Sequence, residues 1–136
     1  VLQPQYNLYD RDSFEGPLAE LCIREDIGVI NYYGLASGFL TGKYRDKADT
    51  EGKARGARAL NYLNDKGLRI LAALDEVAVE TDAEPASIAL AWLIQSPGVT
   101  APIASATSVD QLEAIIAAGN LTLSPGQMRL LNEAGA

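Results

Sequence analysis

Residues 28–44 read GVINYYGLASGFLTGKY. The first part of this stretch, residues 28–32, is a brief β-branched run with the length of a buried parallel strand. Glycines and other small residues follow, so a ligand can approach the backbone closely, and Lys43 then comes within reach of a phosphate. Because ligands gather at the carboxyl ends of parallel strands, the stretch is a candidate site for an anionic ligand.

Two further strands are predicted on either side of this stretch. Residues 1–8 alternate apolar and polar side chains, and residues 99–104, VTAPIA, form a second buried run. The second run delivers residues 102–108 to the start of a helix, where hydroxyls and free backbone N–H groups favour an anion. Three strands cannot close a barrel, so the sheet either has open edges or is completed by residues outside this sequence.

Helical patterns separate the strands, and the succession predicts an α/β fold with parallel strands. The predicted helices cover residues 17–25, 60–81, 85–96, 109–118 and 125–134. Gly67 interrupts the second pattern and is a candidate break. Asp82 or Glu84 is a candidate cap for the third helix. Ser108 and Gln111 have the spacing of a capping box at the fourth helix.

The length, net charge and cysteine content of the sequence exclude several classes of fold, partner and location. The 136 residues are short for a complete (β/α)₈ barrel, which needs about 250. The net charge of −7 argues against a nucleic-acid partner. No apolar run approaches ~20 residues, so no membrane span is predicted. Cys22 is the single cysteine and cannot form an internal disulfide, which fits a reducing compartment, and we expect a cytoplasmic protein.

The sequence contains no histidine. This excludes a His-based catalytic triad and most zinc sites, so no metal site is predicted. It does not exclude binding of a cofactor that brings its own reactivity.

The residues alone leave structural alternatives open for each candidate site. A glycine-rich stretch after a strand is often only a loop, and Ser108 with Gln111 is often only a helix cap. Tyr32 at a strand end is as consistent with a core-edge aromatic residue as with a ligand platform. Gln3 lies in an apolar strand, and a buried amide there needs hydrogen-bond partners, which favours a site. Trp92 is predicted to lie in the core, and Cys22 to be a small buried residue.

Three segments, in register along nearly the whole chain, resemble the aldo-keto reductase family. Residues 28–44 resemble its GVIPYSPLASGFLTGKY type of segment, and the opening QPQYNLYDR resembles its Q-x-x-YN-L-x-R strand. Residues 85–118 resemble its P-x-x-x-AL-x-WL and PI-x-G-A-x-S-x-x-QL stretches. The resemblance implies the C-terminal half of a (β/α)₈ TIM barrel, with residues 1–136 as a single partial domain that binds NADP.

The resemblance also implies cofactor-binding roles. Gln3 is expected to bond the nicotinamide carboxamide, and Tyr32 to stack on the nicotinamide ring. Residues 33–37 are expected to line the pyrophosphate, while Lys43 and Arg55 reach phosphate from the long loop. Ser105, Ala106 and Thr107 are expected to bind the 2′-phosphate end of the cofactor, with Gln111 nearby on the helix. The full set implied by the family is Gln3, Tyr32, Tyr33, Gly34, Leu35, Ala36, Ser37, Lys43, Arg55, Ser105, Ala106, Thr107 and Gln111.

The sequence departs from the family pattern at both ends of this set. Tyr33 and Gly34 replace a common Ser-Pro pair, and Ser105 stands where many members have glycine. Thr107 stands where several members have arginine, and this replacement weakens the expected preference for NADPH over NADH. Two further positions, 114 and 115, hold Ala and Ile where many members carry a Glu-Asn pair that holds the adenine.

The family's catalytic Asp, Tyr, Lys and His come from the first half of the barrel, so no catalytic residue is predicted here. The implied function is an NADP(H)-dependent oxidoreductase that reduces aldehydes and ketones, with this chain supplying the cofactor half and inactive alone. The alternatives are a non-catalytic regulatory subunit of the same fold, such as the potassium-channel β subunits, or an inactive truncated fragment. The expected partners are a carbonyl substrate and either the N-terminal half-barrel or a second copy that covers the open edges.

Overall fold

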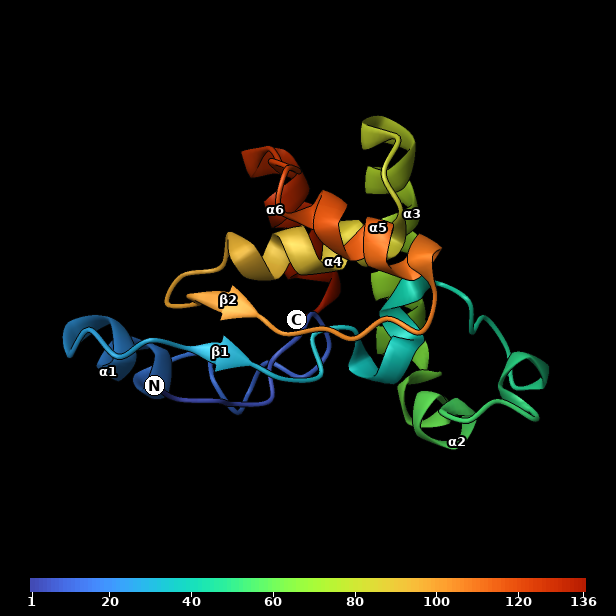
Figure 1. Ribbon diagram of the computed structural model, residues 1–136, viewed down its shortest axis with the longest axis horizontal. Coiled ribbons are helices and arrows are strands. Elements are labelled where there is room, and N and C mark those ends of the chain that lie inside the picture. The colour runs from blue at the N-terminus through green and yellow to red at the C-terminus, as the bar shows by residue number, and fades with distance from the viewer.

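The computed structural model describes residues 1–136, and most of its helices lie on one side of a short parallel sheet (Figure 1). The α-helices and strands, in chain order, are α1 (Pro17–Arg24), β1 (Ile30–Asn31), α2 (Gly56–Ala59), α3 (Asp65–Thr81), α4 (Pro85–Ile94), β2 (Ala101–Pro102), α5 (Val109–Ala118) and α6 (Pro125–Ala134). Three short 3-10 helices join them, namely η1 (Ala36–Thr41), η2 (Ala48–Thr50) and η3 (Leu60–Tyr62).

Strand β1 lies between the N-terminal segment and β2, and all the pairing is parallel. The partners are Ile30 with Ala101, Asn31 with Pro102, Leu2 with Val29, and Gln5 with Tyr32. The predicted parallel arrangement is confirmed, although the paired stretches are shorter than the predicted strands. The outer edges of the N-terminal segment and of β2 carry no further strand, as expected for an incomplete barrel.

Helix α4 forms the centre of the core. Every residue from Ala86 to Leu93 is buried, because the helix is apolar around nearly its whole circumference. Trp92 is 1% exposed, which confirms its predicted place in the core. The polar exception, Ser87, donates its hydroxyl to the carbonyl of Ala114 on α5 at 2.7 Å, so its burial is compensated by a hydrogen bond.

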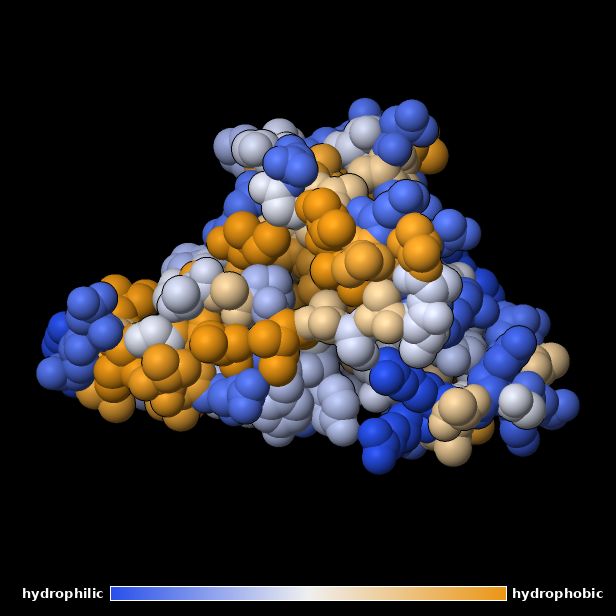
Figure 2. All heavy atoms as spheres, viewed as in Figure 1, coloured by the Kyte–Doolittle hydropathy of each residue, from blue (hydrophilic) through white to orange (hydrophobic).

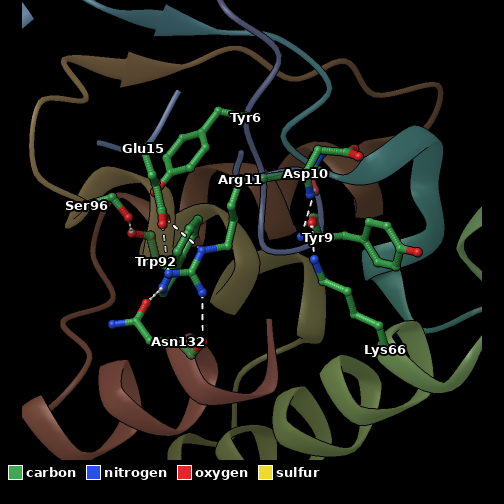
Figure 3. Close-up of polar contacts among 10 residues, drawn as sticks. Tyr6, Tyr9, Asp10, Arg11, Glu15, Lys66, Trp92, Ser96 and Asn132 are labelled. Atoms are coloured by element: carbon green, nitrogen blue, oxygen red, sulfur yellow. Dashed lines mark hydrogen bonds and ion pairs between the residues drawn. The ribbon is translucent and has the colours of Figure 1, made fainter. Parts of the chain in front are cut away.

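A polar cluster around Arg11 ties the N-terminal segment to α4 and α6 (Figure 3). Arg11 pairs with both carboxylate oxygens of Glu15, donates to the carbonyl of Asn132 at 2.7 Å, and lies over the Trp92 ring. The Tyr6 hydroxyl donates to the same Glu15 at 2.8 Å. Burial, followed by that hydrogen bond, raises the pKa of Tyr6 above its usual value, so the hydroxyl stays protonated and donates.

The start of α3 differs from the prediction. Residues 60–62 form the separate turn η3, and α3 begins only at Asp65, where the Asn64 side chain caps it by accepting from the backbone N–H of Gly67 at 3.0 Å. The predicted single helix from Leu60 is therefore wrong, and Gly67 is part of the first turn of α3 and not a break. The side chain of Asn64 satisfies an N–H group that a helix end leaves free.

Two predicted caps are also corrected. Glu84 occupies the N-cap position of α4 without a side-chain hydrogen bond, and Asp82 ends α3 in a left-handed conformation. At α5 the Ser108 hydroxyl accepts from the backbone N–H of Gln111, as predicted. The Gln111 side chain does not return the bond to Ser108, because it accepts from the N–H and hydroxyl of Thr107 instead. The reciprocal capping box occurs at Ser124 on α6.

No helix of the chain is both long and apolar enough to cross a membrane. Cys22 on α1 is buried, in agreement with its predicted structural role.

Candidate functional site

A cavity of about 600 Å³ opens at the carboxyl ends of β1 and β2. Its walls come from the segment after β1, the loop that contains α2, the start of α4, the segment after β2, and the inner face of α5. The volume lies within the range of small-molecule and cofactor pockets, ~300–1,000 Å³. Both stretches that the sequence singled out therefore meet at one cavity.

Most of the family-implied residues lie around this cavity. Those that line it are Tyr32, Tyr33, Gly34, Leu35, Ser37, Lys43, Arg55, Ser105 and Gln111. The remaining four, Gln3, Ala36, Ala106 and Thr107, do not line it. Their roles toward a cofactor stay predictions.

Two of these four have a clear structural place. Ala36 is fully buried, between Leu35 and Ser37, which both line the cavity. Gln3 is exposed, so its predicted burial is wrong, and its amide needs no partner within the protein.

The backbone after β1 is unusual. Tyr33, Ala36 and Ser37 have φ angles of 56°, 48° and 57°, in the left-handed region that residues other than glycine rarely adopt. Non-glycine residues held in this region cluster at ligand-binding segments, where the surrounding structure holds the strain. Gly34 has a steric role, because a Cβ at this position would lie 3.0 Å from Leu93 Cδ1 on α4. The segment thus turns tightly against the core and presents its backbone to the cavity.

The charges of the cavity are opposite to those of the whole chain. Lys43, Arg55 and Arg58 line it, with Glu84 as the one acidic residue, in a chain with net charge −7. The three ion pairs in the structure, Arg11–Glu15, Arg24–Glu25 and Arg45–Asp75, include none of these cations. Cations that lack carboxylate partners and face one cavity attract an anionic ligand there.

The segment after β2 offers backbone donors. The N–H groups of Ser105 and Ala106 donate to no other group of the protein. Gln111 faces the cavity, and its side-chain oxygen accepts from the Thr107 N–H at 2.8 Å, so it holds the turn before α5. Free N–H groups ahead of a helix N-terminus favour a negatively charged group.

Four more lining residues, Gly38, Thr41, Ile103 and Ala104, belong to the two candidate stretches but were given no role of their own. The lining residues outside both stretches and outside the expected set are Arg58, Glu84, Ala86, Ala114 and Ile115. Arg58 had a weak signal, since it follows Arg55 in the same loop, but the short helix α2 that places it was not predicted. Ala114 and Ile115 stood out only as departures from the family pattern. The small and apolar members carry no pattern that separates them from core residues.

A partial (β/α)₈ barrel with a cation-lined cavity at its strand ends is the class of protein that the fold and the site define. The model of the aldo/keto reductase family matches residues 1–136, so the chain belongs to that family. The predicted family is therefore confirmed.

Curated relatives match between 82% and 98% of this chain. An uncharacterized oxidoreductase of Mycobacterium tuberculosis is 43% identical over 97% of the chain, and the L-glyceraldehyde 3-phosphate reductase of Escherichia coli is 32% identical over 98%. A probable voltage-gated potassium channel subunit beta of Oryza sativa is 34% identical over 82%. The chain spans between 36% and 41% of the length of these relatives.

A solved structure confirms the fold class. The crystal structure of a thermostable aldo-keto reductase in complex with the inhibitor epalrestat matches 98% of this chain, with a TM-score of 0.69 and 26% sequence identity. The matched part is 39% of that chain. The α/β fold with parallel strands is thus an incomplete TIM barrel in this chain.

Proposed function

We propose that this chain is the cofactor-binding half of an NADP(H)-dependent carbonyl reductase. The observation that carries the proposal is the group of three unpaired cations, Lys43, Arg55 and Arg58, around one cavity of an acidic chain. A dinucleotide brings a pyrophosphate that needs such partners, and the cavity is large enough for a small cofactor.

The residues of this chain would bind and orient the cofactor. Tyr32 is 36% exposed at the end of β1, where its ring is free to stack on an aromatic ligand. Ser105 and the N–H groups that follow β2 would receive the 2′-phosphate. When bound, the cofactor supplies the hydride that reduces a carbonyl carbon. The family resemblance assigns the proton donor and its partners to the other half of the barrel, so the chain contributes positioning and charge.

A second candidate function is a non-catalytic NADP-binding subunit of the same fold. It is supported by the 34% identity to the probable potassium channel subunit beta of Oryza sativa. Both candidates use the same cofactor site. An assay of carbonyl reduction in the full protein separates them, because only the reductase oxidises NADPH when an aldehyde or ketone is added.

The cofactor site is tested by Tyr32→Ala in the full protein. We expect the affinity for NADPH to fall about tenfold, because aromatic stacking on a base contributes ~1–3 kcal/mol. Affinity is measured by the change in cofactor fluorescence on titration. Tyr32→Phe, which keeps the ring, is the matched control and should bind NADPH normally.

The same variant also separates the two ends of the cofactor. The affinity for 2′-phospho-ADP-ribose, which lacks the nicotinamide, should be the same in Tyr32→Ala and in the unmodified protein. Equal NADPH affinity of both proteins would contradict the stacking role. Absence of saturable NADPH binding by the unmodified protein would overturn the proposed function.

A further inference from the structure

Arg58 lies on the cavity wall with most of its donors free. Its one hydrogen bond in the structure goes from Nη1 to the Tyr33 hydroxyl at 3.2 Å. A guanidinium has five N–H donors in a fixed planar fork, so the others remain available to a ligand. The partner of Arg58 is a hydroxyl and not a carboxylate, so it orients the arginine without forming an ion pair with it.

Tyr33 is itself held in a defined position. Its backbone is left-handed, with φ 56°, and its carbonyl accepts from the side-chain amide of Asn7 at 3.0 Å. Asn7 is completely buried, and its side-chain oxygen accepts from the backbone N–H groups of Tyr9 and Asp10. The buried asparagine therefore fixes the backbone of Tyr33 to the N-terminal segment.

Asp10 connects Asn7 to Tyr62, which follows the loop that carries Arg58. Asp10 accepts from Asn7 and from the Tyr62 hydroxyl, each at 2.9 Å. Burial, followed by the hydrogen bond to Asp10, raises the pKa of Tyr62 above its usual value, so this hydroxyl donates at neutral pH. Asp10 thus joins Tyr62 to Asn7, which holds the Tyr33 carbonyl.

The position of Arg58 along the cavity follows from its neighbours. The rings of Tyr33 and Tyr32 meet edge to face with centroids 5.0 Å apart. Arg58, bonded to the Tyr33 hydroxyl, therefore lies near the Tyr32 end of the cavity. In a dinucleotide the pyrophosphate is one ribose away from the nicotinamide, whereas the 2′-phosphate is at the far end.

We propose that Arg58 binds the pyrophosphate of the cofactor and that Tyr33 is its positioning residue. The proposal rests on the proposed function, because it takes Tyr32 as the nicotinamide platform. Arginine forms bidentate, charge-assisted bonds with phosphate, which need the guanidinium plane to be oriented beforehand. The tyrosine that replaces the family's common serine at position 33 supplies this orientation.

The test compares two cofactors in the full protein. Arg58→Gln should lower the affinity for NADPH and for NADH by the same factor, roughly tenfold or more, because both carry the pyrophosphate. A loss confined to NADPH would place Arg58 at the 2′-phosphate and overturn the proposal, as would unchanged affinity for both. Arg69→Gln, which removes an exposed arginine of α3 outside the cavity, is the matched control and should bind both cofactors normally.

A double-mutant cycle tests the positioning role. Tyr33→Phe keeps the ring and removes the hydroxyl, so it should weaken binding of both cofactors by roughly three- to tenfold. Added to Arg58→Gln it should cause no further loss, whereas a loss of equal size in both backgrounds would overturn the positioning role. The salt dependence of binding is a second readout, and it should become shallower in Arg58→Gln but not in Arg69→Gln.

The result also separates this proposal from the proposed function. If the unmodified protein binds neither dinucleotide, both are overturned. If it binds both and Arg58→Gln binds them equally well, only the role of Arg58 is overturned.

Discussion

Gly67 shows how one residue can have opposite meanings in the sequence and in the structure. In the sequence it interrupts a helical pattern, since glycine disfavours helix by ~1 kcal/mol relative to alanine. In the structure it is the third residue of α3, where a Cβ would overlap the carbonyl oxygen of Tyr62 and lie 2.9 Å from Phe39 Cζ. Its missing side chain lets η3 and η1 pack closely on the start of α3.

Gly67→Ala is therefore expected to destabilise the protein in spite of the better helix propensity of alanine. Relief of the overlap requires a shift of the backbone, for which we expect a cost of about 1–3 kcal/mol in the free energy of unfolding. The measurement is the midpoint of urea unfolding, followed by circular dichroism.

Gly126 on α6 provides the matched control. A Cβ there would meet only Ser124 Oγ at 3.8 Å, an ordinary contact. Gly126→Ala should thus raise the free energy of unfolding by about 0.5–1 kcal/mol. A stabilising effect of both substitutions would show that the overlap at Gly67 is relieved without cost.

At the scale of elements, two helices begin with the same sequence signal but use it differently. Ser124 and Gln127 form a reciprocal capping box at α6, and Gln127 also donates to Glu80 on α3 at 2.8 Å. At α5 the glutamine three residues after the capping serine, Gln111, turns to Thr107 and faces the cavity. The first pair caps α6 and connects it to α3, whereas the second caps α5 and has its glutamine on the cavity wall, which predicts a binding role as well.

Alanine substitutions of the two glutamines should separate these roles. Gln127→Ala should lower the free energy of unfolding by about 0.5–1.5 kcal/mol and leave NADPH affinity unchanged. Gln111→Ala should weaken NADPH binding in addition to any effect on stability. Urea unfolding and cofactor titration of both variants check this, and equal NADPH affinity of the two would contradict a binding role for Gln111.

At the scale of the whole molecule, the structure is an open part of a barrel. Apolar side chains gather over α5 and around the end of the sheet near α1, while polar ones surround the loop that contains α2 (Figure 2). On α5 the exposed apolar row consists of Val109, Leu112 and Ile116, which are 69%, 48% and 59% exposed. Helical neighbours at this spacing form one continuous face.

We propose that residues 1–136, produced by themselves, self-associate through this face and the open strand edges. Light scattering after size exclusion should show a dimer or larger species. Leu112→Glu with Ile116→Glu should shift it toward the monomer, because charge disfavours burial of the row. Val79→Glu changes a residue of α3 that is 86% exposed and should have no effect. A monomeric unmodified chain at all concentrations tested would contradict the proposal.

The sequence by itself determined the parallel strands, most of the helices and more than half of the cavity wall, because these depend on local periodicity and on short segments that follow strands. Tyr32, Lys43 and Ser105 were identified in this way. Only the tertiary structure decided that Arg58 and Glu84 reach the same cavity, that Gln3 is exposed, and that Gly67 is required at a close contact. Such features depend on contacts between segments that are distant in the sequence, and these contacts leave no local pattern.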